Sequence, residues 1–314
     1  MKRLLCLRFL TSYLLLLLTQ QLAAQQSFTP QFNTIAGFRY GSQAAPTGKE
    51  WESPGDLSLN KEQPHAYFFN FQDIEAARKV LPGFSNYYKS LDGTWKFHWV
   101  KHPDERPDRF YEETFDVSGW EDVPVPMSWN IYGIQKDGSL KYGVPVYVNQ
   151  KVIFQHQVKV DDWRGGVMRT PPQDWTTYTY RNEVGSYKRT FDVPASWNGR
   201  EVFINFDGVD NFFYLWINGK YVGFSKNSRN LASFNIGSYL KKGSNTIAVE
   251  VYRNSDASFI EAQDMFRLPG IFRSVYLTSK PKVAIRDIIA IPDLEANYTN
   301  GFLAITADVQ NFEK

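Results

Sequence analysis

Few residues in this sequence combine a reactive side chain with a suggestive spacing. Glu261 and Asp264 lie three positions apart, and two neighbouring carboxylates are a common basis for acid–base catalysis. A salt bridge from Glu261 to Arg253 or Arg267 is the simpler interpretation of the same residues, and an aspartate in a loop is more often a cap or turn residue. The carboxylate pair alone therefore does not predict a catalytic site.

The first 24 residues are predicted to be a secretory signal peptide. Lys2, Arg3 and Arg8 form a basic start, residues 14–18 are all leucine, and small residues allow cleavage after Ala24. The apolar run is too short for a comfortable membrane span, and an uncleaved anchor is the alternative. We therefore expect an exported protein, periplasmic or extracellular, with no membrane segment after cleavage.

Loss of the signal peptide changes the charge and the cysteine content of the chain. It removes three bases from a net charge of +2, which leaves about −1, so charge gives no argument for a nucleic-acid partner. It also removes Cys6, the only cysteine. The mature protein is then held by its core alone, without disulfide or thiol chemistry.

The mature sequence has the pattern of a β protein. Aromatic residues make up 16% of the chain, and alternating apolar and polar residues predict strands within 187–192, 202–207 and 247–251. Asn218-Gly219 joins two further β-rich runs, and both residues tolerate the positive φ angles of a type I′ hairpin turn. Many short strands with frequent turn signals predict a β-sandwich or jelly roll.

An irregular arm is expected before this sandwich, at residues 25–84. It should run over another surface and contain one short helix between residues 71 and 80. Asp73 can cap that helix, and Ile74, Ala77 and Val80 would share one of its faces.

The sandwich itself is expected at residues 85–279. A loop-rich stretch at 115–181 is long for a structureless connection, so it is either functional or packed on something else. Residues 282–314 should hold two strands, at 284–291 and 301–312, which would begin an immunoglobulin-sized domain. Two strands alone are marginal, so the sequence gives the impression of a truncated domain.

Five short motifs occur in order along the sandwich, and together they resemble one family. They are Leu91-Asp92-Gly93-Thr94-Trp95-Lys96-Phe97, Val125-Pro126 with Trp129, Phe206-Asp207-Gly208-Val209, Trp216-Ile217-Asn218-Gly219-Lys220-Tyr221-Val222-Gly223, and Gln263-Asp264-Met265-Phe266-Arg267 with Gly270-Ile271-Phe272-Arg273. The set is similar to the N-terminal sugar-binding domain of glycoside hydrolase family 2, and within it to the β-galactosidases. Upstream, Trp51-Glu52, Asn60, Glu62 and Pro64-His65-Ala66 are similar to the arm that precedes this domain.

The resemblance implies a fold and an order of domains. The fold would be all-β: a galactose-binding-like jelly-roll sandwich, followed by a truncated immunoglobulin-like domain. In the family a (β/α)₈ barrel comes next and supplies the catalytic acids, and a barrel needs about 250 residues. We therefore expect no catalytic residue in this chain. The complete enzyme would hydrolyse terminal β-galactosides with retention.

Two substrate-binding residues are implied by the resemblance. Asn149, in Pro145-Val146-Tyr147-Val148-Asn149, and Asp264 match family positions that point toward the galactose in the barrel. Asp264 also matches a sodium ligand, and magnesium would belong to the missing barrel. Phe266 replaces the usual tryptophan of this loop, which keeps a flat apolar face but loses the indole N–H.

Two alternatives remain open at this stage. The chain could be a stand-alone, non-catalytic carbohydrate-binding or structural β-sandwich protein, because jelly rolls host all of these roles. Within the family, β-glucuronidase and β-mannosidase activities compete with β-galactosidase, and the Gln263-Asp264-Met265 loop favours galactose. The expected partners are a galactoside or other glycan, the missing barrel, and a second copy in a homo-oligomer.

Overall fold

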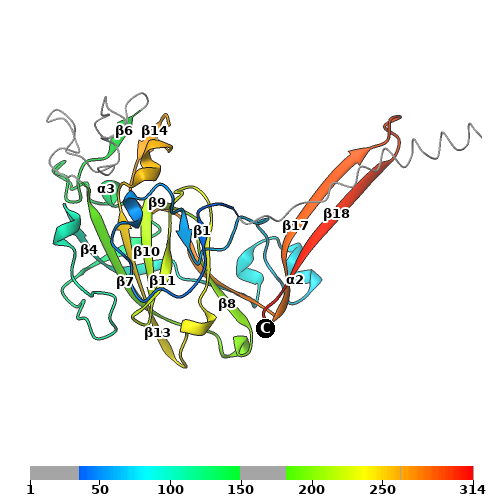
Figure 1. Cartoon of the computed structure of the whole chain (residues 1–314), viewed down its shortest axis with the longest axis horizontal. Coiled ribbons are helices and arrows are strands. Elements are labelled where there is room, and N and C mark those ends of the chain that lie inside the picture. Colours follow the sequence, from blue (N-terminus) through cyan, green and yellow to red (C-terminus); the bar gives the residue numbers. More distant parts are fainter. Residues whose placement is uncertain (1–34, 149–181, 262, 314) are drawn as a thin grey trace, which may run out of the picture. The chain divides into compact units, whose positions relative to one another are not determined.

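Two β-sheets form the body of the computed structural model, which describes residues 35–148, 182–261 and 263–313. The predicted signal peptide at residues 1–24 lies outside these described residues. The larger sheet has eight strands, and several of them are labelled in Figure 1. Their order is β1 (Phe38–Arg39), β2 (Ser58–Leu59), β11 (Lys220–Ser225), β10 (Phe212–Ile217), β13 (Ser244–Tyr252), β7 (Val184–Asp192), β4 (Gly93–Val100) and β5 (Glu121–Val125).

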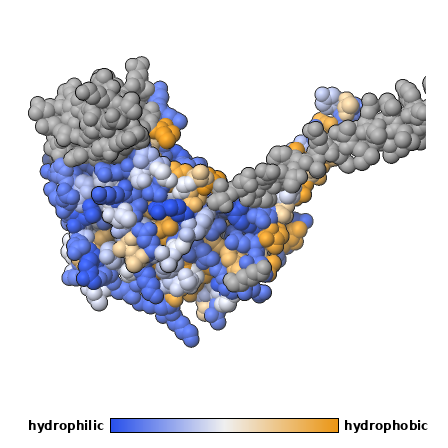
Figure 2. Space-filling model, viewed as in Figure 1, coloured by the Kyte–Doolittle hydropathy of each residue, from blue (hydrophilic) through white to orange (hydrophobic). Residues whose placement is uncertain are grey.

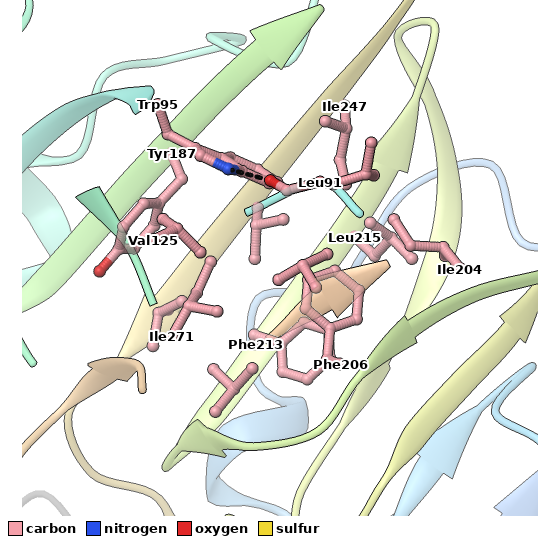
Figure 3. Close-up of a cluster of buried hydrophobic side chains, with 14 of the residues drawn as sticks. Leu91, Trp95, Val125, Tyr187, Ile204, Phe206, Phe213, Leu215, Ile247 and Ile271 are labelled. Carbon is pink, nitrogen blue, oxygen red and sulfur yellow. Dashed lines mark hydrogen bonds between the residues drawn. The ribbon is translucent and has the colours of Figure 1, made fainter. Parts of the chain in front are cut away.

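A four-stranded sheet packs against the larger one through a shared core. Its order is β12 (Ala232–Asn235), β8 (Glu201–Phe206), β16 (Val275–Lys280) and β3 (Tyr88–Ser90). Trp95 and Leu215 from the larger sheet and Ile204 and Phe206 from the smaller one are all fully buried (Figure 3). The indole of Trp95 donates a hydrogen bond to the Leu91 carbonyl at 2.9 Å, so its polar atom is satisfied inside the core. The predicted all-β sandwich is confirmed.

The hairpin predicted at Asn218-Gly219 joins β10 to β11, which are paired antiparallel. The φ angles of the two turn residues are 51° and 75°. Both are positive, as a type I′ turn demands, and glycine and asparagine tolerate this region better than other residues.

The arm closes one side of the sandwich. Its strand β2 pairs with β11 at the edge of the larger sheet, and Lys61 then forms a bridge to Phe234 on β12, in the smaller sheet. The fit against β11 is tight: a Cβ atom on Gly223 would lie 2.0 Å from the Leu59 carbonyl oxygen. The arm therefore holds two sheet edges together.

A second aromatic cluster lies on the face of the larger sheet that points away from the core. Trp51, in the 3₁₀ helix η1 (Glu50–Glu52), stacks on Tyr252 with 5.4 Å between ring centroids. Phe110, beyond η3 (Pro103–Glu105), contacts Trp216 edge to face, with 5.9 Å between ring centroids. Trp51 of the arm thus packs on this face of the larger sheet.

The short helix predicted in the arm is present as α2 (Ile74–Arg78), followed by η2 (Pro82–Phe84). Asp73 caps it by accepting a hydrogen bond from the Ala76 amide at 2.7 Å. The predicted apolar face is wrong, because Ile74 and Val80 are exposed and Ala76 is the buried residue. The helix is only five residues long, so it packs through a single small side chain.

Beyond the sandwich, β17 (Val283–Leu294) and β18 (Gly301–Asn311) form a two-stranded sheet, where the sequence predicted two strands. Residues 289–306 belong to a compact unit separate from the sandwich. Hydrophobic residues lie exposed along the hairpin (Figure 2): Val283, Ile285, Ile291, Leu294, Phe302, Leu303, Ile305 and Val309. Of the helices described, none has the length and apolar character needed to cross a membrane.

Candidate functional site

Two short strand pairs extend the sandwich at the end where β8 finishes. The strand β9 (Val209–Asp210) follows β8 and pairs with β15 (Gly270–Ile271). The strand β6 (Val146–Val148) pairs with β14 (Met265–Arg267), and the two lie side by side at this end (Figure 1). The helix α3 (Trp129–Tyr132) and η7 (Asp256–Phe259) complete the described elements there.

Asp264 is exposed, immediately before β14. One of its carboxylate oxygens, Oδ1, accepts a hydrogen bond from the hydroxyl of Tyr147. This bond, more than burial, raises the pKa of the Tyr147 hydroxyl. The Tyr147 ring lies 5.3 Å from that of Phe266, and the two rings are 51% and 59% exposed. The loop thus presents a carboxylate beside two accessible aromatic rings.

Asn149 lies outside the described residues, and the structure fixes only its neighbour along the chain. Val148, the last residue of β6, pairs with Met265, the residue after Asp264. In the described part of the chain, no group of three or more His, Cys, Asp or Glu residues is arranged to hold a metal ion. Both the sugar roles and the sodium role stay predictions.

Glu261 has different partners from those predicted. It accepts hydrogen bonds from the Asn211 side chain at 2.8 Å, and from the amide and hydroxyl of Ser228 at 2.9 and 2.5 Å. The predicted salt bridge to Arg253 or Arg267 is wrong. Glu261 nevertheless has a structural role, because its hydrogen bonds tie the loop before β14 to the segments after β9 and β11.

Arg253 forms a buried ion pair with Glu183, at 2.5 Å between Nη1 and Oε1. The two side chains are 2% and 0% exposed. Burial raises the pKa of Glu183, and the charge of Arg253 opposes that shift. Arg253 also donates to the Val144 carbonyl at 2.8 Å. It therefore anchors the segment that leads into β6 and Tyr147.

A second ion pair lies under β14. Arg229 approaches the Asp210 carboxylate at 3.2 Å and the Met265 sulfur at 3.4 Å. Burial raises the pKa of Asp210 to about 6, although Arg229 favours its charged form. Sequence patterns gave no indication of this pair, because its members lie 19 positions apart in separate loops. Through Arg229, this pair links Asp210 to Met265, the first residue of β14.

The combination of fold and motifs agrees with comparisons to known proteins. The profile of glycosyl hydrolases family 2, sugar binding domain, matches residues 88–281. The chain belongs to this family. The resemblance inferred from the five motifs is confirmed, and the family match starts at β3 and ends one residue after β16.

Curated relatives in this family carry a common name. The β-galactosidase of Priestia megaterium is 39% identical over 264 residues, which are 84% of this chain and 24% of that protein. The β-galactosidase of Photobacterium profundum is 35% identical over 83% of this chain and 23% of its own length. The chain thus spans about a quarter of the length of the relatives it matches.

Solved structures of family members show the same fold. The β-glucuronidase of Bacteroides uniformis has a TM-score of 0.51 at 19% identity, over 71% of this chain and 22% of that one. A β-glucuronidase from an uncultured Clostridium species has a TM-score of 0.51 at 17% identity, over 80% of this chain and 36% of that one. At such identities the likeness concerns the family 2 sandwich and not the substrate.

Proposed function

We propose that this chain is the sugar-binding front part of an exported β-galactosidase-like glycoside hydrolase. Its complete form would hydrolyse terminal β-galactosides with retention. Family membership and the β-galactosidase relatives at 34 to 39% identity support the proposal. A retaining glycosidase needs two carboxylates about 5 Å apart across the bond that breaks. We propose that these lie in the remainder of an enzyme as long as its relatives.

The observation that carries the proposal is the exposed Asp264 carboxylate. Tyr147 occupies one lone pair of Oδ1, which leaves Oδ2 and a second lone pair of Oδ1 to accept sugar hydroxyls. Beside it, the exposed Phe266 ring offers an apolar face for the C–H groups of a pyranose. The loop is held from below by Arg229 and Glu261, so it is preorganised for a ligand.

The remaining expectations belong to the same proposal. Asn149 would donate to one sugar oxygen and accept from another hydroxyl, and Asp264 would also contribute to a sodium site. The enzyme would be exported by its signal peptide and would assemble as a homo-oligomer. Magnesium would bind in the barrel. Each of these follows from the family resemblance and the sequence, and none changes the role of Asp264.

Titration of the chain with galactose, followed by the NMR shifts of the Asp264 and Met265 amides, tests the proposal. We expect a dissociation constant of about 1 mM or weaker, because one loop supplies few contacts. Asp264→Asn should weaken binding by about tenfold, as expected for losing a hydrogen bond to a charged group. Asp137→Asn is the matched control, because Asp137 accepts hydrogen bonds from Ser139 of its own loop.

Two outcomes would contradict the proposal. Equal galactose affinity in Asp264→Asn and Asp137→Asn would remove the sugar role of Asp264. A sub-micromolar affinity of the isolated chain would instead favour a stand-alone carbohydrate-binding protein, because such a site would not depend on contacts from a catalytic domain.

A further inference from the structure

A polar groove of about 620 Å³ lies at the opposite end of β8 from Asp264. Its walls come from four segments that are distant in the sequence: the arm, the start of β8, the stretch from Asn235 through η6 (Gly237–Tyr239), and Lys282 after β16. This volume falls within the range of about 300 to 1,000 Å³ that is typical of small-molecule sites. Glu201 begins β8 on this side, whereas Asp210 follows its far end.

The groove walls are fixed by hydrogen bonds before any ligand arrives. Asn60 donates to the carbonyls of Gly41 and Val222 at 2.9 and 2.8 Å, and accepts from the Gly41 amide at 2.9 Å. Across the groove, Glu201 accepts a hydrogen bond from Asn235 at 2.6 Å and another from Lys282. These hydrogen bonds between the arm and the sandwich hold the lining residues in place, and none of them uses the carboxylate of Glu62.

The Glu62 carboxylate lines this groove with unused hydrogen-bonding capacity. The nearest base, Arg286, approaches it only at 4.0 Å, and among the described residues no hydrogen-bond donor contacts its oxygens. Burial raises the pKa of Glu62, while Arg286 and Lys280 oppose the shift. Its side chain retains 19% exposure, toward the groove that it lines. A ligand with hydroxyl donors would supply the missing hydrogen bonds.

The other lining groups indicate what kind of ligand fits. Tyr40, which is 52% exposed, and Tyr239 add two aromatic rings. The charges of Glu62 and Glu201 are balanced by those of Arg200 and Lys282. A balanced set favours a neutral ligand over a phosphate or a cation. A carboxylate that accepts vicinal hydroxyls beside aromatic rings is suited to a sugar.

We propose that this groove is a second saccharide site, which takes one or two neutral sugar units. Glu62 accepts their hydroxyls, and Tyr40 and Tyr239 cover their C–H faces. The site shares no residue with the Asp264 loop, so it neither requires nor repeats the binding of galactose there. A domain with both sites holds a glycan at each end of β8.

NMR titration of the chain with lactose, at concentrations up to about 50 mM to detect millimolar affinity, tests this site. The amides of Gly237 and Ser238, which line the groove, should shift on addition of lactose. Glu62→Gln should weaken this response by about tenfold, because a neutral amide is a poorer acceptor than a carboxylate. Tyr40→Ala, which alters an exposed ring, should weaken it several-fold without affecting the fold.

Asp264→Asn separates the two sites. The lactose response at Gly237 and Ser238 should be unchanged in this variant, whatever happens at the Asp264 loop. The second site is overturned if these amides do not shift with lactose, if Glu62→Gln and Tyr40→Ala leave the response unchanged, or if inorganic phosphate or calcium shifts them more strongly than lactose.

Discussion

The two ends of β8 use charged side chains differently. Near its last residue, the buried Glu183 and Arg253 form an ion pair with each other, and the buried Asp210 pairs with Arg229. At its start, Glu62 and Arg200 line a solvent-accessible groove. A buried charge must be paired to be tolerated. The buried ion pairs can therefore position a loop, but they are not accessible to a ligand. Glu62 in the groove, by contrast, has no hydrogen-bond donor on its carboxylate among the described residues, so it keeps its capacity to accept hydrogen bonds.

Removal of the buried Arg253 should cause the largest loss of stability among the variants that test this difference between the two ends. Arg253→Met leaves Glu183 as an unpaired carboxylate that is 0% exposed, and loss of one partner of a buried ion pair costs about 3 to 5 kcal/mol. Urea unfolding should show a decrease of this size in the free energy of unfolding. The double variant Arg253→Met, Glu183→Leu should recover most of the loss.

The matched control is Arg78→Met, which removes the partner of Glu75 in an ion pair that is 68% and 74% exposed. Its effect should stay within about 0.5 kcal/mol, as is usual for surface pairs. A decrease for Arg253→Met no larger than that of Arg78→Met would mean that the buried pair does not support the Asp264 end.

At the groove, the binding response should depend on the contact between the arm and β11. Gly223→Ala places a Cβ atom 2.0 Å from the Leu59 carbonyl oxygen, so the arm must move away from β11 at a cost of about 2 to 3 kcal/mol. Hydrogen exchange of the Leu59 and Asn60 amides should accelerate, and the lactose response at Gly237 should weaken.

Gly83→Ala serves as the control, because a Cβ atom there meets no atom within 4 Å. It should change neither exchange in the arm nor the lactose response. Unchanged exchange at Leu59 in Gly223→Ala would show that the arm does not depend on its close approach to β11.

The smallest effect should be a pH dependence that belongs to the Asp264 end. Asp210 has a pKa raised from 3.8 to about 6, so the folded state binds a proton that the unfolded state has released. The resulting stability is fully present below pH 3.8 and is lost as the pH rises through 6. Asp210→Asn cannot titrate, and relative to it the wild type should lose on the order of 1 to 2 kcal/mol between pH 4 and 7.

Asp116→Asn is a control with the opposite sign. Hydrogen bonds from the Ser118 amide and hydroxyl lower the pKa of Asp116, so its contribution to stability is present above the unfolded pKa and fades as the pH falls. Thermal unfolding across pH 4 to 7 distinguishes the two variants. Parallel pH profiles for the wild type and Asp210→Asn would contradict the assignment of this slope to Asp210.

Local sequence signals predicted the local parts of this fold. The turn at Asn218-Gly219 and the cap at Asp73 depend on the conformational preferences of a few adjacent residues, and both are present. The apolar face of α2 was not predictable in the same way. Which side of a five-residue helix is buried depends on the surface it meets, and that surface comes from elsewhere in the chain.

The family motif predicted the candidate site at Asp264. It did not predict the ion pairs and hydrogen bonds that hold the Asp264 loop in place. The motif points to Asp264, whereas spacing along the chain predicts Arg253 or Arg267 as the partner of Glu261. In the structure Arg253 pairs with Glu183, 70 positions away, and Glu261 bonds to Asn211 and Ser228. Loops that meet at one end of a sandwich are brought together by strand order, and spacing in the sequence does not show which polar groups will face each other.

The bridge that the arm makes between β11 and β12 also bears on self-association. An uncovered edge strand exposes unpaired amides and carbonyls that can template pairing with another molecule. The family match begins at residue 88, after the arm, but β2 and Lys61 cover the edges of both sheets. A protein trimmed to the matched region would present two bare, apolar strand edges. A protein that keeps residues 58–62 should therefore be less prone to non-specific pairing through these edges than one trimmed to the matched region.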